Sequence, residues 1–103
     1  MKAFLTGSRA FGKPREHSDY DVVVRMDEEE AFLLIGATGH EVPFDYGPHS
    51  ISLKFGMLNL VVCLTDEAYA VWGAATAEAK KKKPISRPAA IEIFRAQIKK
   101  SLA

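Results

Sequence analysis

The chain has 103 residues, of which 48% are hydrophobic, and its formal net charge is +1. This length suits one compact domain over residues 1–103 with a modest core. The balanced charge gives no general attraction to nucleic acid, and the single cysteine, Cys63, excludes an intramolecular disulfide and a cysteine zinc site. No apolar run approaches the roughly 18 residues that a membrane span needs, so we expect a cytoplasmic protein with no membrane contact.

The hydrophobic pattern predicts strands and helices along the whole chain. In the first half we expect a strand at 2–6, a short helix near Ser8, a loop at 13–18, a strand at 19–25 and a helix that begins at Asp27 and ends between residues 36 and 39. In the second half we expect a loop or short edge strand at 41–48, strands at 51–55 and 58–64, a helix from Thr65 or Asp66 to about Ala79, and a last helix from Ser86 to about Lys100. This order predicts an α/β (α+β) fold in which helices flank a mixed sheet of about four strands.

Local signals support particular elements of this prediction. Asp27 is followed three residues later by Glu30, the pattern of a capping box. The pair Gly56 and Met57 separates two strand patterns and predicts a hairpin. In the last helix, Ile91, Phe94 and Ile98 share one face, which predicts ordinary core packing.

One stretch near the N-terminus combines residues that chemistry could use. Gly7 and Ser8 follow the first strand, and a glycine turn that opens a helix lets backbone N–H groups approach a phosphate closely. Asp19 and Asp21 follow after a ten-residue spacer, and side chains at i and i+2 of a strand share a face. Two neighbouring carboxylates repel each other unless a hard cation such as Mg²⁺ lies between them, so the stretch predicts a site for a metal and a nucleotide. The alternative is a tight turn before a strand that opens with two solvated aspartates.

At these residues the sequence resembles the nucleotidyltransferase superfamily of polymerase-beta-like proteins. The shared pattern is a hydrophobic residue, Gly7-Ser8, a spacer, and then Asp19-Tyr20-Asp21. The fuller strings Gly-Ser-Arg-Ala-Phe-Gly and Ser-Asp-Tyr-Asp are similar to the small stand-alone members called minimal nucleotidyltransferases. The resemblance implies a metal-dependent transferase that moves a nucleoside monophosphate, with AMP expected, from a Mg-NTP to an acceptor hydroxyl.

The resemblance also assigns roles to individual residues. Gly7 and Ser8 would hold the terminal phosphates, with Arg9 as the best-placed cation because it follows Ser8 directly. Asp19 and Asp21 would be catalytic and would bind Mg²⁺ or Mn²⁺. Lys13, Arg15 and Lys54 are further cations that could neutralise phosphate, although exposed solubilising charge is the simpler interpretation of Lys13 and Arg15.

Two features of the sequence depart from the usual members of this superfamily. Relatives usually carry a helix ahead of the Gly-Ser strand, and many carry a larger helical region after the sheet. Here the strand begins at once and only two helices are predicted after the sheet, so we expect another protein or a nucleic acid to hold the acceptor. Assembly into an oligomer stays open.

The third acidic position of the superfamily is occupied by Asn59, in the string Leu58-Asn59-Leu60. An amide can ligate Mg²⁺ through its oxygen, but it brings no negative charge and cannot act as a base. Glu41, Asp45 or Asp66 could substitute from a neighbouring loop. Asn59 therefore leaves two alternatives to an active enzyme: a degenerate module that binds a nucleotide or a protein partner without turnover, and an antitoxin-like member that modifies or masks a partner protein.

Overall fold

The chain folds into strands and helices in the order that the sequence predicts. The structure is a computed structural model that describes residues 2–38, 44–45 and 49–102. Its elements are β1 (Ala3–Thr6), α1 (Ser8–Phe11), β2 (Tyr20–Arg25), α2 (Glu28–Thr38), β3 (Phe44–Asp45), β4 (Ser50–Phe55), β5 (Leu58–Cys63), α3 (Asp66–Lys81) and α4 (Arg87–Leu102). The predicted loop or edge strand at 41–48 contains β3, and the rest of that range lies outside the described residues.

The strands form one mixed sheet, which confirms the predicted fold class. Within the described residues its order is β1-β2-β5-β4-β3, and β3 contributes only two residues at one edge. Strands β2 and β5 run parallel, whereas the pairs β1·β2, β4·β5 and β3·β4 are antiparallel. Gly56 has a φ of 60° in the two-residue turn between β4 and β5, so the predicted hairpin is present. The chain therefore returns as β5 beside β2, directly next to the strand that carries Asp21.

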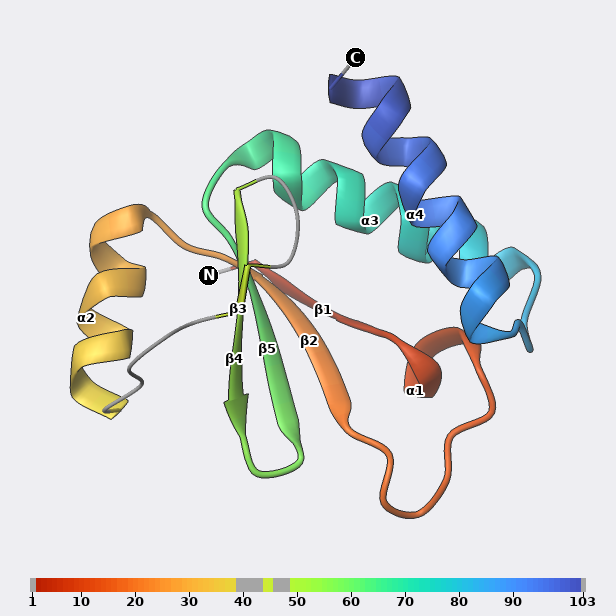
Figure 1. The fold of residues 1–103 in the computed structure, drawn as a ribbon, viewed down its shortest axis with the longest axis horizontal. Coiled ribbons are helices and arrows are strands. Elements are labelled where there is room, and N and C mark those ends of the chain that lie inside the picture. The colour runs from red at the N-terminus through yellow and green to blue at the C-terminus, as the bar shows by residue number, and fades with distance from the viewer. Residues whose placement is uncertain (1, 39–43, 46–48, 103) are drawn as a thin grey trace.

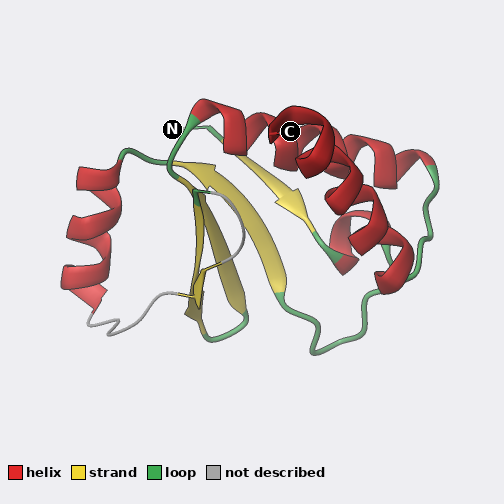
Figure 2. Cartoon of the chain, turned by 45° about the horizontal axis from the view of Figure 1, so that its top comes forward, coloured by secondary structure: helices red, strands yellow, loops and turns green. Residues whose placement is uncertain are grey.

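Helices cover the two faces of the sheet unequally (Figure 1). On one face, α2 packs through Ala31 and its neighbours against a cluster that includes Val24, Leu53 and Val62. On the other face, α3 lies across β2 and β5, and α4 packs against α3 (Figure 2). The core is thus divided between the two faces, because successive residues of each strand point to opposite sides.

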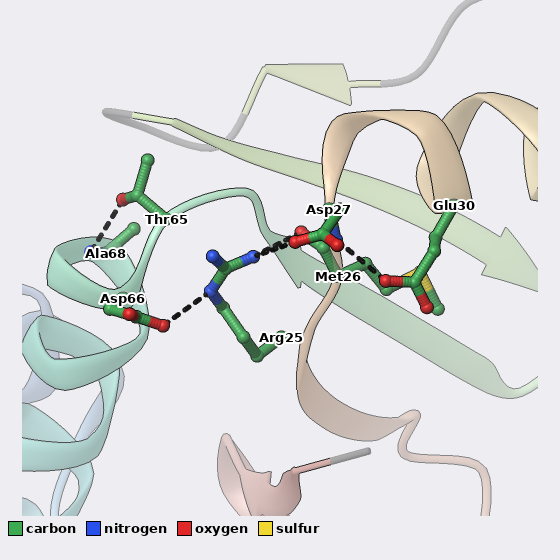
Figure 3. A network of polar contacts seen from close by, with 7 residues as sticks. All are labelled: Arg25, Met26, Asp27, Glu30, Thr65, Asp66 and Ala68. Atoms are coloured by element: carbon green, nitrogen blue, oxygen red, sulfur yellow. Dashed lines mark hydrogen bonds and ion pairs between the residues drawn. The ribbon is translucent and has the colours of Figure 1, made fainter.

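A polar network fixes the starts of α2 and α3 at the C-terminal end of β2 (Figure 3). The Arg25 guanidinium donates to Asp66 at 2.9 Å and lies 3.5 Å from Asp27. The backbone N–H of Asp27 donates to the Glu30 carboxylate at 3.2 Å, which is one half of the predicted capping box. Thr65 caps α3, because its hydroxyl accepts from the backbone N–H of Ala68 at 3.1 Å. Asp66 is therefore the partner of Arg25 rather than the cap.

Cys63 is fully buried at the end of β5, in a cluster with Val23 and Val61. Burial raises the pKa of its thiol, so the side chain stays neutral and packs as a small hydrophobic group. Among the described segments, no helix is both long and apolar enough to cross a membrane.

Candidate functional site

A cavity of about 1010 Å³ opens between one end of the sheet and helices α3 and α4. It brings together five of the six predicted site residues, namely Gly7, Ser8, Asp19, Asp21 and Asn59. Helix α4 forms much of the opposite wall through Arg87, Ala90, Ile91, Phe94, Arg95 and Ile98. Arg9 does not line this cavity.

The polar end of the cavity follows from strand alternation. On the face that α3 covers, Asp21 precedes Val23 on β2, and Asn59 precedes Val61 on β5. Val23 and Val61 are buried in the cluster beneath α3. Asp21 and Asn59 lie one repeat closer to the end of the sheet, where they line the cavity together with Val61. The same sheet face is therefore apolar beneath the helix and polar beyond it.

Gly7 forms the turn between β1 and α1, and two features of the structure require glycine there. Its backbone has φ 72° and ψ −162°, a conformation that residues with a Cβ rarely adopt. A Cβ on Gly7 would also lie 2.0 Å from Oδ2 of Asp21. The predicted reason for glycine was close approach of a phosphate, and the structure adds a direct one: the glycine leaves room for the Asp21 carboxylate.

Asp21 and Asn59 are directly opposite each other on the parallel strands β2 and β5. The Asn59 side-chain amide donates from Nδ2 to Asp21 Oδ1 at 3.0 Å. On its other side, the Asn59 Oδ1 atom accepts a hydrogen bond from the hydroxyl of Ser52 on β4. Both polar ends of the Asn59 amide are therefore used within the protein.

The two aspartates lie in different electrostatic surroundings. Asp19 pairs with Lys54, whose Nζ lies 3.0 Å from Asp19 Oδ2. Burial raises the pKa of Asp21, the hydrogen bond from Asn59 opposes that shift, and the neighbouring Asp19 charge adds to it. Arg87, at the start of α4, and Lys54 both act to lower the pKa of Asp21. The positive charges of two other elements thus act on this carboxylate pair.

A family model described as a nucleotidyltransferase domain matches residues 1–100. The chain belongs to the nucleotidyltransferase family. This assignment confirms the resemblance drawn from Gly7-Ser8 and Asp19-Tyr20-Asp21, and it agrees with the mixed sheet. No curated protein and no solved structure matches the chain significantly.

Asn59, which the sequence resemblance assigns to the third acidic position of the family, lies beside Asp21. Asp66 cannot substitute for it: Asp66 pairs with Arg25, which lies four residues beyond Asp21 on β2, about 13 Å along the strand. Asp45 is in β3, which β5 and β4 separate from β2. Glu41 lies outside the described residues. Within the described segments, no three acidic, histidine or cysteine side chains gather in a way that could hold a metal.

Arg9 belongs to α1, and its side chain packs against the loop that precedes β2. Its guanidinium donates to the backbone carbonyl of Ser18 at 2.8 Å and to those of Arg15 and Glu16 at 3.3 Å. It also stacks on Tyr20, with its Cζ atom 4.0 Å from the ring centroid. The geometry thus gives Arg9 a part in holding the spacer loop rather than a place in the cavity.

Helix α4 supplies residues that the sequence interpretation missed. The predicted core face with Ile91, Phe94 and Ile98 also lines the cavity, and Ile91 is 41% exposed. Phe94 packs against the buried cluster that includes Ala90. The prediction of ordinary core packing is therefore confirmed for Phe94 and wrong for Ile91. Arg87 and Arg95 lie on the same wall. Arg87, Ile91 and Arg95 follow one another at intervals of four residues, so they share one face of the helix. This spacing is the feature of the sequence from which their common wall could have been predicted.

The donor groups at the sheet end fit a hard divalent cation. Asp19 and Asp21 are carboxylates on one wall of an open cavity, and Mg²⁺ is commonly bound through one or two carboxylates plus substrate phosphates. Asp21 Oδ2 lies over Gly7, at the turn where the phosphates are expected. The residues present therefore fit a divalent cation, which Asp19 and Asp21 would hold.

Proposed function

We propose that this nucleotidyltransferase moves a nucleoside monophosphate, with AMP expected, from a Mg-NTP to an acceptor hydroxyl. The observation that carries the proposal is the convergence of Gly7, Ser8, Asp19 and Asp21 on one cavity in a chain of this family. These are the residues that such a transfer needs on the nucleotide side. Membership of the family supports nucleotidyl transfer in general. The identities of the nucleotide, the metal and the acceptor are what we propose here.

Different residues of the chain would bind the phosphates and the metal ion. Gly7 and Ser8 offer a close approach for phosphate oxygens at the start of α1, and Arg87 faces the same space from α4. Asp19 and Asp21 would hold Mg²⁺ or Mn²⁺, which supplies Lewis-acid stabilisation of the charge that develops on the phosphates. Arg9 acts indirectly, because it holds the carbonyls of the loop that leads to Asp19.

The proposed reaction is an in-line displacement at the α-phosphorus. The acceptor oxygen forms a bond to that phosphorus, and the bond to the oxygen that bridges to the β-phosphate breaks. Pyrophosphate leaves with the electron pair, and the hydroxyl proton passes to water. The protein's part is to position the triphosphate and to stabilise its charge.

The open cavity supports an acceptor that belongs to another macromolecule. The α4 wall with Ile91, Arg95 and Ile98 extends beyond the carboxylate end, and it offers both apolar surface and positive charge. A small acceptor would find little enclosure in such an open space. A protein or nucleic acid that covers the α4 wall could place its hydroxyl beside the nucleotide.

Label transfer tests this proposal. The protein is incubated with each of the four NTPs labelled at the α-phosphate, with Mg²⁺ or Mn²⁺ and host extract. We expect a macromolecule in the extract to acquire label from one preferred NTP, and Asp19→Asn with Asp21→Asn to abolish the signal. Label that appears equally with the double variant would contradict the proposal.

Asn59 favours a second candidate, a module that binds nucleotide without turnover. Its side chain is a neutral amide, so it gives the site no third negative charge, and both ends of that amide are held by Asp21 and Ser52. Asn59→Asp separates the two candidates. If the wild type only binds, Asn59→Asp should create or strongly raise transfer or slow NTP hydrolysis, whereas an enzyme adapted to Asn59 should already show transfer that the substitution changes little.

A further inference from the structure

Lys54 places a positive charge beside Asp19, one member of the aspartate pair. It lies on β4 directly opposite Asn59, and its Nζ reaches across to Asp19 Oδ2 at 3.0 Å. The Lys54 and Asp19 side chains are 64% and 36% exposed, and ion pairs at such exposure add little to folding stability. Whatever it adds to stability, the ammonium changes the charge that a metal ion would meet at Asp19.

Asn59 has a fixed orientation that reinforces this effect. If its amide were flipped, the Oδ1 atom would face the ionised oxygen of Asp21, and two acceptors would repel each other. The observed orientation gives N–H to Asp21 and oxygen to Ser52, so Asn59 presents no oxygen to a metal at Asp21. One oxygen of each aspartate thus already has a positively polarised partner within the sheet.

The charge at the site follows from these contacts. Two carboxylates and one ammonium leave a single net negative charge among Asp19, Asp21 and Lys54. Within the described residues no third acidic side chain joins the pair, so two divalent ions would have to share these two carboxylates and the substrate phosphates. A divalent ion near Asp19 would also be repelled by Lys54.

We propose that Lys54 acts as a built-in cation in place of a second divalent ion, so that the chain binds one metal ion with its nucleotide. The inference rests on the proposed use of Asp19 and Asp21 as metal ligands. Lys54 neutralises Asp19, and the metal is held mainly by the remaining aspartate oxygens, including Asp21 Oδ2 beside Gly7. The neutral amide of Asn59 and the ammonium of Lys54 then both suit a site that holds a single divalent ion.

Binding of Mn²⁺ alone, followed by electron paramagnetic resonance of the free ion, tests the lysine. Lys54→Met should bind Mn²⁺ on the order of tenfold more tightly than wild type, because a positive charge close to a divalent ion is removed. Lys54→Arg keeps the charge and should resemble wild type. Lys80→Met is the matched control, since Lys80 is exposed near the end of α3 and, among the described residues, forms no ion pair with Asp19 or Asp21.

The number of ions bound gives a second readout. With a non-hydrolysable α,β-methylene analogue of ATP at saturation, wild type should bind one Mn²⁺ per chain. The double variant Lys54→Met with Asn59→Asp should bind two. The proposal would be overturned if wild type bound two ions or if the double variant bound only one. It would also be overturned if Lys54→Met and wild type had equal affinity for Mn²⁺, or if neither bound it.

Failure of this inference is distinguishable from failure of the proposed transfer. If no macromolecule acquires label but Lys54→Met still tightens Mn²⁺ binding, the transfer is wrong and the role of Lys54 stands. If label transfer is found and Lys54→Met leaves Mn²⁺ binding unchanged, the transfer stands and the lysine has another role.

Discussion

Gly7 and Asp21 depend on each other in this structure. The glycine has a backbone conformation that a Cβ disfavours, and the space beside its Cα holds one oxygen of the Asp21 carboxylate. A single substitution at Gly7 would therefore disturb both the turn and the proposed metal ligand. The two segments that carry the proposed site are therefore coupled by direct contact.

Gly7→Ala should lose roughly 1–3 kcal/mol of folding free energy from backbone strain alone, and nucleotide binding should be lost because Asp21 is displaced. Chemical denaturation and calorimetry with Mg-ATP measure the two effects. Gly36→Ala is the control: it lies in α2 with nothing within 4 Å of its added Cβ, and it should gain roughly 0.5–1 kcal/mol. A Gly7→Ala protein as stable as Gly36→Ala would contradict this account of the turn.

Asp21 should make stability depend on pH in a direction opposite to most carboxylates. Burial raises its pKa above the ordinary value of 3.8, so the folded chain binds more protons than the unfolded chain between 3.8 and the raised value. The raised pKa of Asp21 therefore lowers the free energy of unfolding. This loss of stability is absent at a pH below 3.8 and is complete at a pH above the pKa of Asp21 in the folded chain. Bound metal would remove part of this loss.

Asp21→Asn removes this loss of stability, so without metal the variant should melt above wild type near neutral pH, and its advantage should shrink as the pH falls toward 4. Thermal melts in EDTA across this range measure the difference. Glu78→Gln, an exposed acid on α3, should show no such trend. A gain for Asp21→Asn that stays constant with pH would mean that the carboxyl is not responsible.

At the scale of elements, α4 is the part of the fold whose role differs most from its sequence pattern. It packs on α3 rather than on the sheet, so one side of it faces the cavity across from the aspartates. Arg87 at its first turn is close enough to lower the pKa of Asp21. The helix thus adds positive charge to a site whose ligands come from the strands.

Arg87→Gln should weaken NTP binding about tenfold, because a charged partner of the phosphates is lost, with little change in stability since the side chain is exposed. Calorimetry with Mg-ATP measures the affinity. Lys99→Gln near the end of α4 removes an equal charge outside the cavity and should leave the affinity unchanged. Equal losses in both variants would point to general charge rather than to Arg87.

For the whole molecule, nucleotide binding should stabilise the fold by mass action. Mg-ATP at about 100 times its dissociation constant adds about 2.7 kcal/mol, which for a domain of this size raises the melting temperature by roughly 10–20 °C. Scanning calorimetry should find this rise with wild type and none with EDTA or with Asp19→Asn and Asp21→Asn combined. An equal rise in EDTA would show that nucleotide binds without the metal and the aspartate pair.

The sequence by itself determined the elements, the family and the principal residues of the candidate site. Alternation marked the hairpin strands, capping residues marked the starts of α2 and α3, and the spacing from Gly7 to Asp19 and Asp21 marked the nucleotide side. These signals can be read without a structure because each depends on neighbours within a few residues along the chain.

Only the tertiary structure decided which distant side chains share the site. Asn59 lies 38 residues from Asp21 and meets it because β5 pairs in parallel with β2. Lys54 reaches Asp19 only across the β4–β5 hairpin, and the apolar face of α4 lines a cavity because α4 packs on α3. Strand order and helix placement depend on the packing of the whole chain, and no local period of the sequence encodes them.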